Sequence, residues 1–291
     1  MSSATNSSAP KPQKYSALIK GLALEKGFSK VHITDASVDA KSQERYLAWL
    51  EKNYHGSMQY MQEHADLRLN PKKLLPKAQR IILVRMDYFP PDDQSIPNLE
   101  NKHKAYISRY ALAKDYHKLM RKRLKQLAEA ISQTIENTFA YRPFVDSAPV
   151  LEKSLAVQSG MGFMGKHTNI IDPQSGSYFF LGSLFIDLDL AIDAPFEKNH
   201  CGSCNACMKA CPTEAIIAPY QLDARKCISY LTIEHKGSID KKYRKAIGNR
   251  IFGCDDCQLY CPFTKFTKTT KEPGFLQERG FKNPDLLELW E

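Results

Sequence analysis

The spacing of apolar residues divides most of the chain into alternating helices and strands. Apolar positions three and four residues apart predict amphipathic helices over residues 14–27, 40–53 and 115–137. An unbroken apolar run at residues 81–84 and a mostly apolar segment at residues 176–186 are typical of buried strands. Shorter patterns predict strands at residues 31–33, 106–110 and 141–145, and helices at residues 58–61, 147–159, 222–232 and 240–250. This alternation predicts a fold of the α/β (α+β) class.

Three stretches fall outside these elements. Arg68 lies in a polar segment that is predicted to be a loop. Residues 88–97 are rich in turn residues, and loops of this length inside a domain tend either to line sites or to be disordered. Residues 160–171 are rich in glycine but match neither a phosphate-binding loop nor a dinucleotide fingerprint. Their glycines indicate backbone that packs closely against something flat or bulky.

Asp146 lies between the strand predicted at residues 141–145 and a helix predicted to begin at Ser147. Proteins built from helices and strands commonly place functional groups at such a junction, so Asp146 is a candidate site residue. The alternative is a helix cap, in which the Asp or Ser side chain accepts hydrogen bonds from free backbone N–H groups. Position alone favours the cap.

Composition limits the class of protein. A chain of 291 residues suits one large domain with a smaller one attached, and its 43% hydrophobic content is ample for a core. No window approaches the roughly 18 unbroken apolar residues of a membrane span. The opening residues 1–13 are polar and contain proline, so we expect a disordered tail rather than a secretory signal. Together with many free cysteines, these features predict a cytoplasmic protein that does not insert into membranes.

The charge balance is basic, with a formal net charge of +9. A solvated basic surface is the simplest explanation, and a polyanionic partner is the sharper one, because Lys and Arg side chains gain affinity by neutralising phosphates. Two predicted helices concentrate this charge, at residues 115–137 and 240–250. The residues concerned are Lys118, Arg121, Lys122, Arg123 and Lys125 in the first helix, and Lys241, Lys242, Arg244, Lys245 and Arg250 in the second.

All eight cysteines lie between residues 201 and 261. The run from Cys201 to Pro212 has the spacing C-x2-C-x2-C-x3-C-P of bacterial two-cluster ferredoxins, in which the fourth thiolate binds the other cluster. An incomplete copy ends at Cys261 and Pro262, and Cys227 is left to complete it. The interleaving rule then predicts two 4Fe–4S clusters, one held by Cys201, Cys204, Cys207 and Cys261, and the other by Cys211, Cys227, Cys254 and Cys257.

Zinc and disulfides are the alternatives for cysteines at this spacing. Zinc sites rarely use three cysteines at successive two-residue gaps followed by proline. Disulfides suit a small secreted domain rather than a chain of this length without a secretory signal. The spacing therefore favours iron–sulfur clusters.

Five segments together resemble the epoxyqueuosine reductases. They are residues 145–153 (Val-Asp-Ser-Ala-Pro-Val-Leu-Glu-Lys), 160–166 (Gly-Met-Gly-Phe-Met-Gly-Lys), 201–212, 222–232, and 248–258 with the signature Gly-Asn-Arg-Ile-Phe-Gly-Cys-Asp-Asp-Cys-Gln. The resemblance extends over roughly residues 15–270. It implies a nitroreductase-like cobalamin-binding domain joined to a bacterial-ferredoxin-like domain with two clusters. It also implies the reduction of epoxyqueuosine to queuosine at the wobble position of tRNA, the last step of queuosine biosynthesis.

The same resemblance implies roles for individual residues. Asp146 matches the family's proton donor. The residues expected to line the cobalamin are Arg68, Ser108, Asp146, Ile170, Leu181, Ser229, Cys254 and Asp255. A carboxylic acid donates a proton only if it is protonated at the working pH. Burial would raise the pKa of Asp146, whereas a helix that begins at Ser147 would lower it.

The resemblance also suggests an organisation and partners. We expect a tail at residues 1–13, a cobalamin-binding domain at 14–195, a ferredoxin-like domain at 196–270 and a carboxyl-terminal segment at 271–291. The expected partners of this monomer are the anticodon region of queuosine-family tRNA and an electron donor such as a flavodoxin or ferredoxin system. Many family members continue into helical repeats that help to hold tRNA, whereas this sequence ends at Glu291.

Two other functions fit part of the pattern. A reductive dehalogenase pairs the same two kinds of cofactor, although its respiratory members usually carry a twin-arginine export signal that is absent from this sequence. A plain electron-transfer ferredoxin with an unrelated amino-terminal module would need the cysteines but no cobalamin. Binding of cobalamin separates that third function from the other two.

Overall fold

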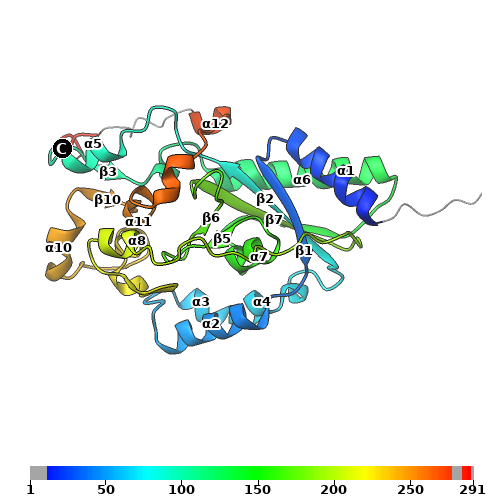
Figure 1. Cartoon of the computed structure of the whole chain (residues 1–291), viewed down its shortest axis with the longest axis horizontal. Helices are drawn as coiled ribbons and strands as arrows, with labels where there is room; N and C mark the ends of the chain where they lie inside the picture. Colours follow the sequence, from blue (N-terminus) through cyan, green and yellow to red (C-terminus); the bar gives the residue numbers. More distant parts are fainter. Residues whose placement is uncertain (1–11, 277–283, 290–291) are drawn as a thin grey trace, which may run out of the picture.

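The computed structural model describes residues 12–276 and 284–289. Its centre is a four-stranded sheet in the order β1-β2-β7-β4, in which every neighbouring pair is antiparallel (Figure 1). The strands are β1 (Lys30–Asp35), β2 (Arg80–Asp87), β7 (Phe179–Ile186) and β4 (Tyr141–Phe144). The apolar runs in the sequence lie on the two central strands, which confirms their prediction as buried strands.

Strand β2 shows how the sequence builds two cores. Its side chains alternate between the two faces of the sheet. Ile82 and Val84 enter one apolar cluster, while Ile81 and Leu83 enter the other. Both faces of this strand are therefore buried, which explains its nearly continuous apolar sequence.

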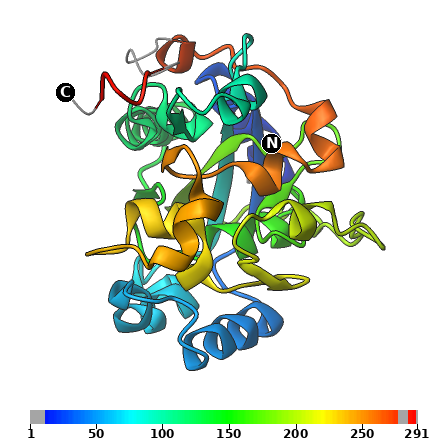
Figure 2. The same ribbon diagram turned by 90° about the vertical axis from the view of Figure 1, so that its left-hand side faces the viewer.

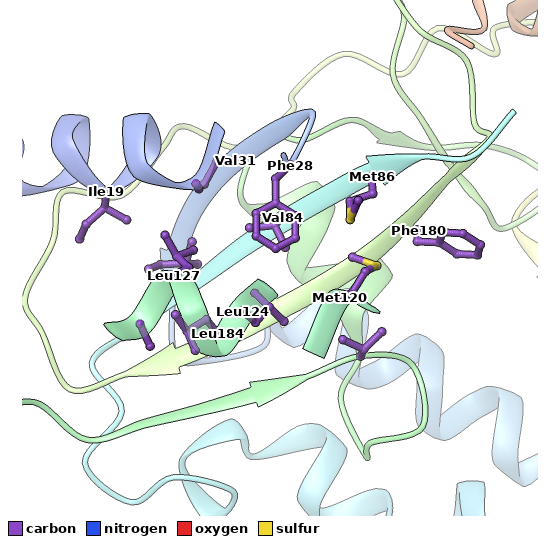
Figure 3. Packing of buried hydrophobic residues seen from close by; sticks show 14 of the residues in the cluster. Ile19, Phe28, Val31, Val84, Met86, Met120, Leu124, Leu127, Phe180 and Leu184 are labelled. Carbon is purple, nitrogen blue, oxygen red and sulfur yellow. The ribbon is translucent and has the colours of Figure 1, made fainter. Parts of the chain in front are cut away.

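Two long helices cover the first face of the sheet. They are α1 (Pro12–Glu25) and α6 (Tyr116–Ile135), and Figure 3 shows their side chains meeting those of the strands. Met120 and Leu124 of α6 are fully buried, and burial of one such side chain contributes about 1.5–3 kcal/mol. Helix α6 approaches β7 closely at Gly182, where an added Cβ would lie 3.1 Å from Met120 Cε.

The other face is covered by α7 (Glu152–Gln158), beside the short strands β5 (Phe163–Met164) and β6 (Ile170–Ile171). Further helices lie below it in Figure 1, namely α2 (Ala40–Glu51), α3 (Gln59–Glu63) and α4 (Ala65–Leu69), followed by the 3-10 helix Pro71–Lys73. Arg68 thus lies in a helix, and its prediction as part of a loop is wrong. The Asp66 carboxylate stabilises the connection between α4 and the 3-10 helix by accepting hydrogen bonds from Asn70 and Lys73.

The cysteine-bearing part of the chain lies across the middle of the molecule, coloured yellow to orange in Figure 2. Strand β10 (Arg250–Phe252) pairs in parallel with β3 (Tyr106–Ile107), which joins this part to the amino-terminal half. Trp49 of α2 also packs on the apolar cluster of this part and donates from Nε1 to Leu222 O at 2.8 Å. Its other elements are α8 (Ala206–Ala210), β8 (Ile216–Ala218), β9 (Gln221–Leu222), α9 (Ile228–Ile233), α10 (Lys241–Ile247) and α11 (Asp256–Leu259).

Several predicted boundaries change. The helix predicted at residues 222–232 is broken at Cys227, whose extended backbone separates the 3-10 helix Ala224–Lys226 from α9. The loop predicted at residues 88–97 runs into α5 (Ser95–Glu100), and the extended segment at 106–110 ends after β3. The tail predicted at residues 1–13 lies outside the described residues, apart from Pro12 and Gln13, which begin α1.

The glycine-rich stretch packs closely, but against the chain itself. Gly160 has a φ of +80°, and an added Cβ would lie 2.2 Å from Ala194 O. At Gly162 an added Cβ would lie 2.5 Å from Ile171 O. These contacts explain both glycines, because any side chain there would collide with backbone.

A chain that crosses a membrane as a helix needs a long apolar helix. Within residues 12–276 and 284–289, no helix is both long and apolar enough for that purpose.

Candidate functional site

Two adjoining cavities lie between the amino-terminal half of the chain and the cysteine-bearing part. The larger one has a volume of about 820 Å3, and the smaller one about 280 Å3. Tyr110 and Lys153 line both. Arg68 and Asp146 lie in the larger cavity, while Cys254 of the second cysteine run lies in the smaller one. The other predicted cobalamin contacts in the smaller cavity are Ser108, Ser229 and Asp255, and the predicted cluster ligands Cys211, Cys227 and Cys257 line it as well.

Asp146 follows β4 and faces the larger cavity. Its φ of +50° is uncommon for a residue with a side chain, although Asp tolerates it better than most. Tyr116 donates a hydrogen bond from its hydroxyl to Asp146 Oδ2, and His117 Nε2 lies 3.4 Å from the same oxygen. With 62% of its side chain exposed, the carboxyl group is held by these two neighbours and stays open to the cavity.

The capping role that position favoured for Asp146 is wrong. Helix α7 begins only at Glu152, and Leu151 precedes it without a side-chain cap. The backbone N–H of Asp146 donates to Glu152 Oε1 at 3.2 Å, so the loop is tied to the helix by the glutamate. The helix predicted to begin at Ser147 therefore begins five residues later, at Glu152. Its amino-terminus is correspondingly farther from Asp146 in the sequence.

Tyr116 and His117 are functional candidates that the sequence did not reveal. Tyr116 stacks on Phe180 of β7 with ring centroids 3.8 Å apart and 7° between the planes. His117 Nδ1 lies 2.9 Å from Asp115 Oδ1, which fixes the ring with Nε2 towards Asp146. Burial raises the pKa of the Tyr116 hydroxyl well above its usual value, so this group remains a hydrogen-bond donor. Tyr116 and His117 are the first two residues of the amphipathic helix α6. Their local sequence therefore gives no sign of a functional role.

Glu152 is the second carboxyl group beside Asp146. Burial raises the pKa of Glu152 to about 8, and the nearby negative charge of Asp146 contributes to the rise. Arg68 lies in the same cavity, buried, with Nη1 3.4 Å from Ala148 O. Its Nε has no hydrogen-bond partner among the described residues. The Glu152 carboxyl therefore keeps a proton at neutral pH, beside a buried arginine whose Nε–H is unpaired in the described part of the chain.

Glu152→Gln is expected to change how stability depends on pH. The pKa of Glu152 is about 8 in the folded protein and 4.5 in the unfolded chain. Between these pH values the folded protein keeps a proton that the unfolded chain releases. The free energy of unfolding of the unmutated protein therefore falls as the pH rises from 4.5 to 8, by at most about 1.4 kcal/mol per pH unit. The variant lacks this component, and it can still accept a hydrogen bond from Asp146 N–H.

Anaerobic denaturant unfolding at about pH 6 and about pH 8 measures this difference. Glu44→Gln, at an exposed position of α2, is the matched control and should behave like the unmutated protein. If the free energy of unfolding falls equally in both variants between these two pH values, Glu152 does not titrate in this range.

Lys153 extends from α7 into the junction of the cavities. Its Nζ donates to Asn169 Oδ1 at 2.9 Å. Surrounding protein displaces water from this side chain, and this desolvation lowers the pKa of Lys153. The negative charge of Asp146 opposes that shift. Lys153 thus places a cationic group between Asp146 and the cysteines.

Asp255 joins the two halves of the chain from a buried position. Its carboxylate accepts hydrogen bonds from Tyr106 OH at 2.7 Å, Ser108 Oγ at 2.6 Å and Arg109 N at 2.8 Å. Burial raises the pKa of Asp255, and these hydrogen bonds counteract the rise. Ser108 also abuts Gly253, where an added Cβ would lie 2.6 Å from Ser108 Cβ. Asp255 therefore fixes the loop that carries Cys254 against β3.

The eight cysteines are free thiols, and all except the exposed Cys204 are buried or partly buried. Burial and the nearby Cys201, Cys261 and Cys204 raise the pKa of Cys207 to about 11. Burial also raises the pKa of Cys257, with further contributions from Cys227, Cys211 and, more weakly, Cys207. The thiols that act on Cys207 thus belong to its predicted set, whereas Cys257 is affected by two thiols of its own predicted set and by Cys207 of the other.

This arrangement suits iron–sulfur clusters. Thiolates are the ligands of such clusters, and bound iron stabilises the deprotonated form that burial disfavours. Among the described residues, no three His, Cys, Asp or Glu side chains lie close enough to hold a single metal ion. A cube-shaped cluster, with one ligand at each iron corner, spaces its thiolates more widely than a single ion does.

Two predicted cofactor contacts lie elsewhere. Ile170 and Leu181 pack in the apolar cluster around Leu155, and neither lines the two cavities. The cavities nevertheless have properties that a large cofactor requires. They are contiguous and rich in aromatic side chains, and the buried Nε atom of Arg68 and Nε2 atom of His167 have no partner in the described part of the chain. These features fit the cobalamin that the sequence resemblance implies.

Comparison with known proteins identifies relatives along nearly the whole chain. A family model described as "Epoxyqueuosine reductase QueG, DUF1730" matches residues 68–147, and one described as "4Fe-4S double cluster binding domain" matches residues 200–264. The epoxyqueuosine reductase of Pseudomonas aeruginosa is 49% identical over 288 residues, which cover 99% of this chain and 79% of that protein. The second family match supports iron–sulfur clusters over zinc or disulfides.

Solved structures agree in fold. The crystal structure of an epoxyqueuosine reductase with an epoxyqueuosine-modified tRNA-Tyr stem loop has a TM-score of 0.84 at 27% identity, covering 95% of this chain and 72% of that one. A Bacillus subtilis epoxyqueuosine reductase, solved with an aspartate catalytic loop swung out of the active site, has a TM-score of 0.83 at 28% identity, with the same coverage. A B12-dependent reductive dehalogenase, 14% identical, shares the fold alone, with a TM-score of 0.57 over 90% of this chain and 34% of that one. The predicted fold class is confirmed, and this chain belongs to the epoxyqueuosine reductase family of oxidoreductases.

Proposed function

We propose that this protein reduces epoxyqueuosine to queuosine at the wobble position of tRNA, with a cobalamin in the cavities and two 4Fe–4S clusters on the cysteines. One observation carries the proposal. Asp146 and the thiols of the second cysteine set open onto the same pair of adjoining cavities, with Lys153 between them. A proton donor and a source of electrons therefore face one space, as a reductive removal of oxygen requires.

The overall reaction is balanced by groups in this space. Conversion of an epoxide to an alkene consumes two electrons and two protons and releases water. When bound, the clusters supply electrons one at a time, and cobalamin supplies the cobalt chemistry at the carbon atoms. The residues of this chain supply protons and position: the Asp146 carboxyl, once it has taken up a proton, passes it to the departing epoxide oxygen, and the second proton comes from solvent.

Tyr116 and His117 position the Asp146 carboxyl. The Tyr116 hydroxyl donates to one oxygen of Asp146, which leaves the other oxygen free to carry and deliver a proton. Phe180 fixes the Tyr116 ring by stacking, and Asp115 fixes the His117 ring. The aspartate loop of the Bacillus subtilis relative, which was solved outside its active site, supports a mobile Asp146 loop that these contacts hold inward.

The remaining predicted site residues would hold the cofactors. We assign the cobalamin to Arg68, Ser108, Asp146, Ser229, Cys254 and Asp255 around the cavities, with Ile170 and Leu181 contributing from the adjacent core. We assign one cluster to Cys201, Cys204, Cys207 and Cys261, and the other to Cys211, Cys227, Cys254 and Cys257. Residues 14–195 would then form the cobalamin-binding domain and residues 196–270 the cluster domain of a cytoplasmic monomer that takes electrons from a flavodoxin or ferredoxin system.

The tRNA would approach over the basic helix α10. Lys241, Lys242, Arg244 and Lys245 are all exposed, and α10 follows Ile233 and Glu234, which line the larger cavity. Only Lys242 of these four pairs with a carboxylate among the described residues, at 3.0 Å from Asp240. The family relative solved with a tRNA stem loop supports a nucleic-acid partner for this surface.

Replacing these four basic residues with Gln is expected to flatten the salt dependence of tRNA binding. Each lost phosphate contact lowers the slope of log affinity against log salt concentration by roughly 0.7–0.9. The slope should therefore fall by about 2–3 if most of the four residues contact phosphates. Titrations of tRNA binding at several salt concentrations give this slope for each variant.

Lys14→Gln combined with Lys26→Gln is the control, because α1 lies at the opposite end of the molecule from α10 in Figure 1. Its slope should match that of the unmutated protein. An unchanged slope in the α10 variant would remove α10 from the tRNA-binding surface.

The test of function starts with the cofactor. Protein purified without oxygen and supplied with cobalamin should show the absorption of one bound cobalamin in addition to that of its clusters. The loaded protein should then convert epoxyqueuosine in tRNA and leave a halogenated phenol unchanged. Absence of bound cobalamin would favour a plain electron-transfer protein, and loss of halide from the phenol would favour a dehalogenase.

A further inference from the structure

Lys166 holds the loop between the first two cysteines. It lies in the turn between β5 and β6, and only 9% of its surface is exposed. Its Nζ donates hydrogen bonds to Gly202 O and to Cys204 O, both at 2.7 Å. A lysine from the amino-terminal half thus places its ammonium group against the backbone of the first cysteine run.

Other contacts fix this geometry from both sides. Asn199 donates from Nδ2 to Met164 O at 3.0 Å, and its Oδ1 accepts from Cys201 N at 2.9 Å. The carbonyl of Lys166 accepts a hydrogen bond from Tyr220 N at 3.0 Å. The turn and the cysteine loop are therefore connected at several points, so the ammonium has a defined position.

No carboxylate offsets this charge directly. Lys166 takes part in none of the ion pairs formed among residues 12–276 and 284–289. Its two acceptors are neutral carbonyl groups. A buried charge is weakly screened by water and acts more strongly on its surroundings than an exposed one does.

We propose that Lys166 raises the reduction potential of the cluster held by Cys201, Cys204, Cys207 and Cys261. The proposal rests on the proposed cluster assignment. A cluster gains one negative charge when it accepts an electron, and a fixed positive charge nearby favours that reduced form. Net charge, hydrogen bonding and exposure are the factors that set cluster potentials. Because Cys204 is exposed, this cluster lies where an external donor can reach it, and Lys166 would make it a better electron acceptor than it would be without this charge.

The test is a redox titration of the two clusters in anaerobic protein without cobalamin or tRNA. Electron paramagnetic resonance measures how much of each cluster is reduced at each potential. Lys166→Met and Lys166→Gln remove the charge. Each should weaken the electron affinity of one cluster by about tenfold, a fall of about 59 mV for a one-electron couple. The potential of the second cluster should stay unchanged.

Two further variants control the result. Lys166→Arg keeps the charge and should keep the potential. Lys209→Met removes an exposed charge from α8, between Cys207 and Cys211. This variant should shift the potential of the cluster much less. Unchanged potentials in both neutral variants would overturn the proposal. Loss of the cluster's iron in both, but not in Lys166→Arg, would also overturn it by showing that the ammonium closes the loop instead.

This readout is independent of catalysis. A protein that fails to reduce epoxyqueuosine can still show the shift in one potential, and that result would leave the role of Lys166 intact. A protein that reduces epoxyqueuosine normally, but shows no shift, would contradict the role of Lys166 alone.

Discussion

Asp146→Asn is expected to lower the rate of epoxide reduction by about 10²–10⁴-fold, the usual contribution of a general acid. Asn has the same shape as Asp and can still accept the hydrogen bond from Tyr116. It has no acidic proton to deliver to the departing oxygen. The variant should therefore keep its clusters and bind cobalamin, while the chemical step fails.

Single-turnover assays with reduced, cobalamin-loaded protein measure this rate without a contribution from product release. Asp66→Asn is the matched control, because it neutralises an exposed carboxylate whose partners are Lys73 and Asn70 rather than the cavity. It should react at the unmutated rate. Full turnover by the Asp146 variant would exclude a role for this group as the proton donor.

Replacing a single cysteine with Ser should remove about half of the iron and abolish turnover, because each cluster needs four thiolates. The interleaved assignment makes a sharper prediction. Cys261→Ser should lose the same cluster as Cys201→Ser, although 60 positions separate these residues in the chain. Cys254→Ser should instead lose the same cluster as Cys211→Ser.

Iron analysis and the electron paramagnetic resonance signal that remains in each variant identify the lost cluster. Matching signals in the Cys261 and Cys254 variants would mean that the second cysteine run binds one cluster by itself. That result would contradict the interleaved sets. It would also place Lys166 beside a cluster with a different set of ligands.

The parts of the fold that follow from local pattern were predictable. The apolar run at residues 81–84 specifies a strand buried on both faces, and helix α6 follows from its apolar spacing. The cysteine spacing specified the chemistry of the second half, because cluster ligands must recur at fixed intervals. These features depend on neighbouring residues, so a single sequence contains them.

The features that depend on distant contacts could not be predicted. Tyr116 faces Asp146 because α6 packs on β4 and begins beside the loop that follows this strand, and nothing in its local sequence indicates that contact. Cys227 breaks a helix-like pattern because its backbone is extended between two short helices. Lys166 reaches the cysteine loop 36 residues later in the chain. The cavities arise only when these segments come together.

The nucleoside content of tRNA after anaerobic incubation is the most direct measurement. Protein loaded with cobalamin and both clusters is mixed with epoxyqueuosine-containing tRNA and a reductant, and the digested tRNA is analysed. Queuosine should replace epoxyqueuosine in the complete mixture and remain absent when cobalamin is omitted. Unchanged epoxyqueuosine in the complete mixture, with all cofactors bound, would contradict the proposed function.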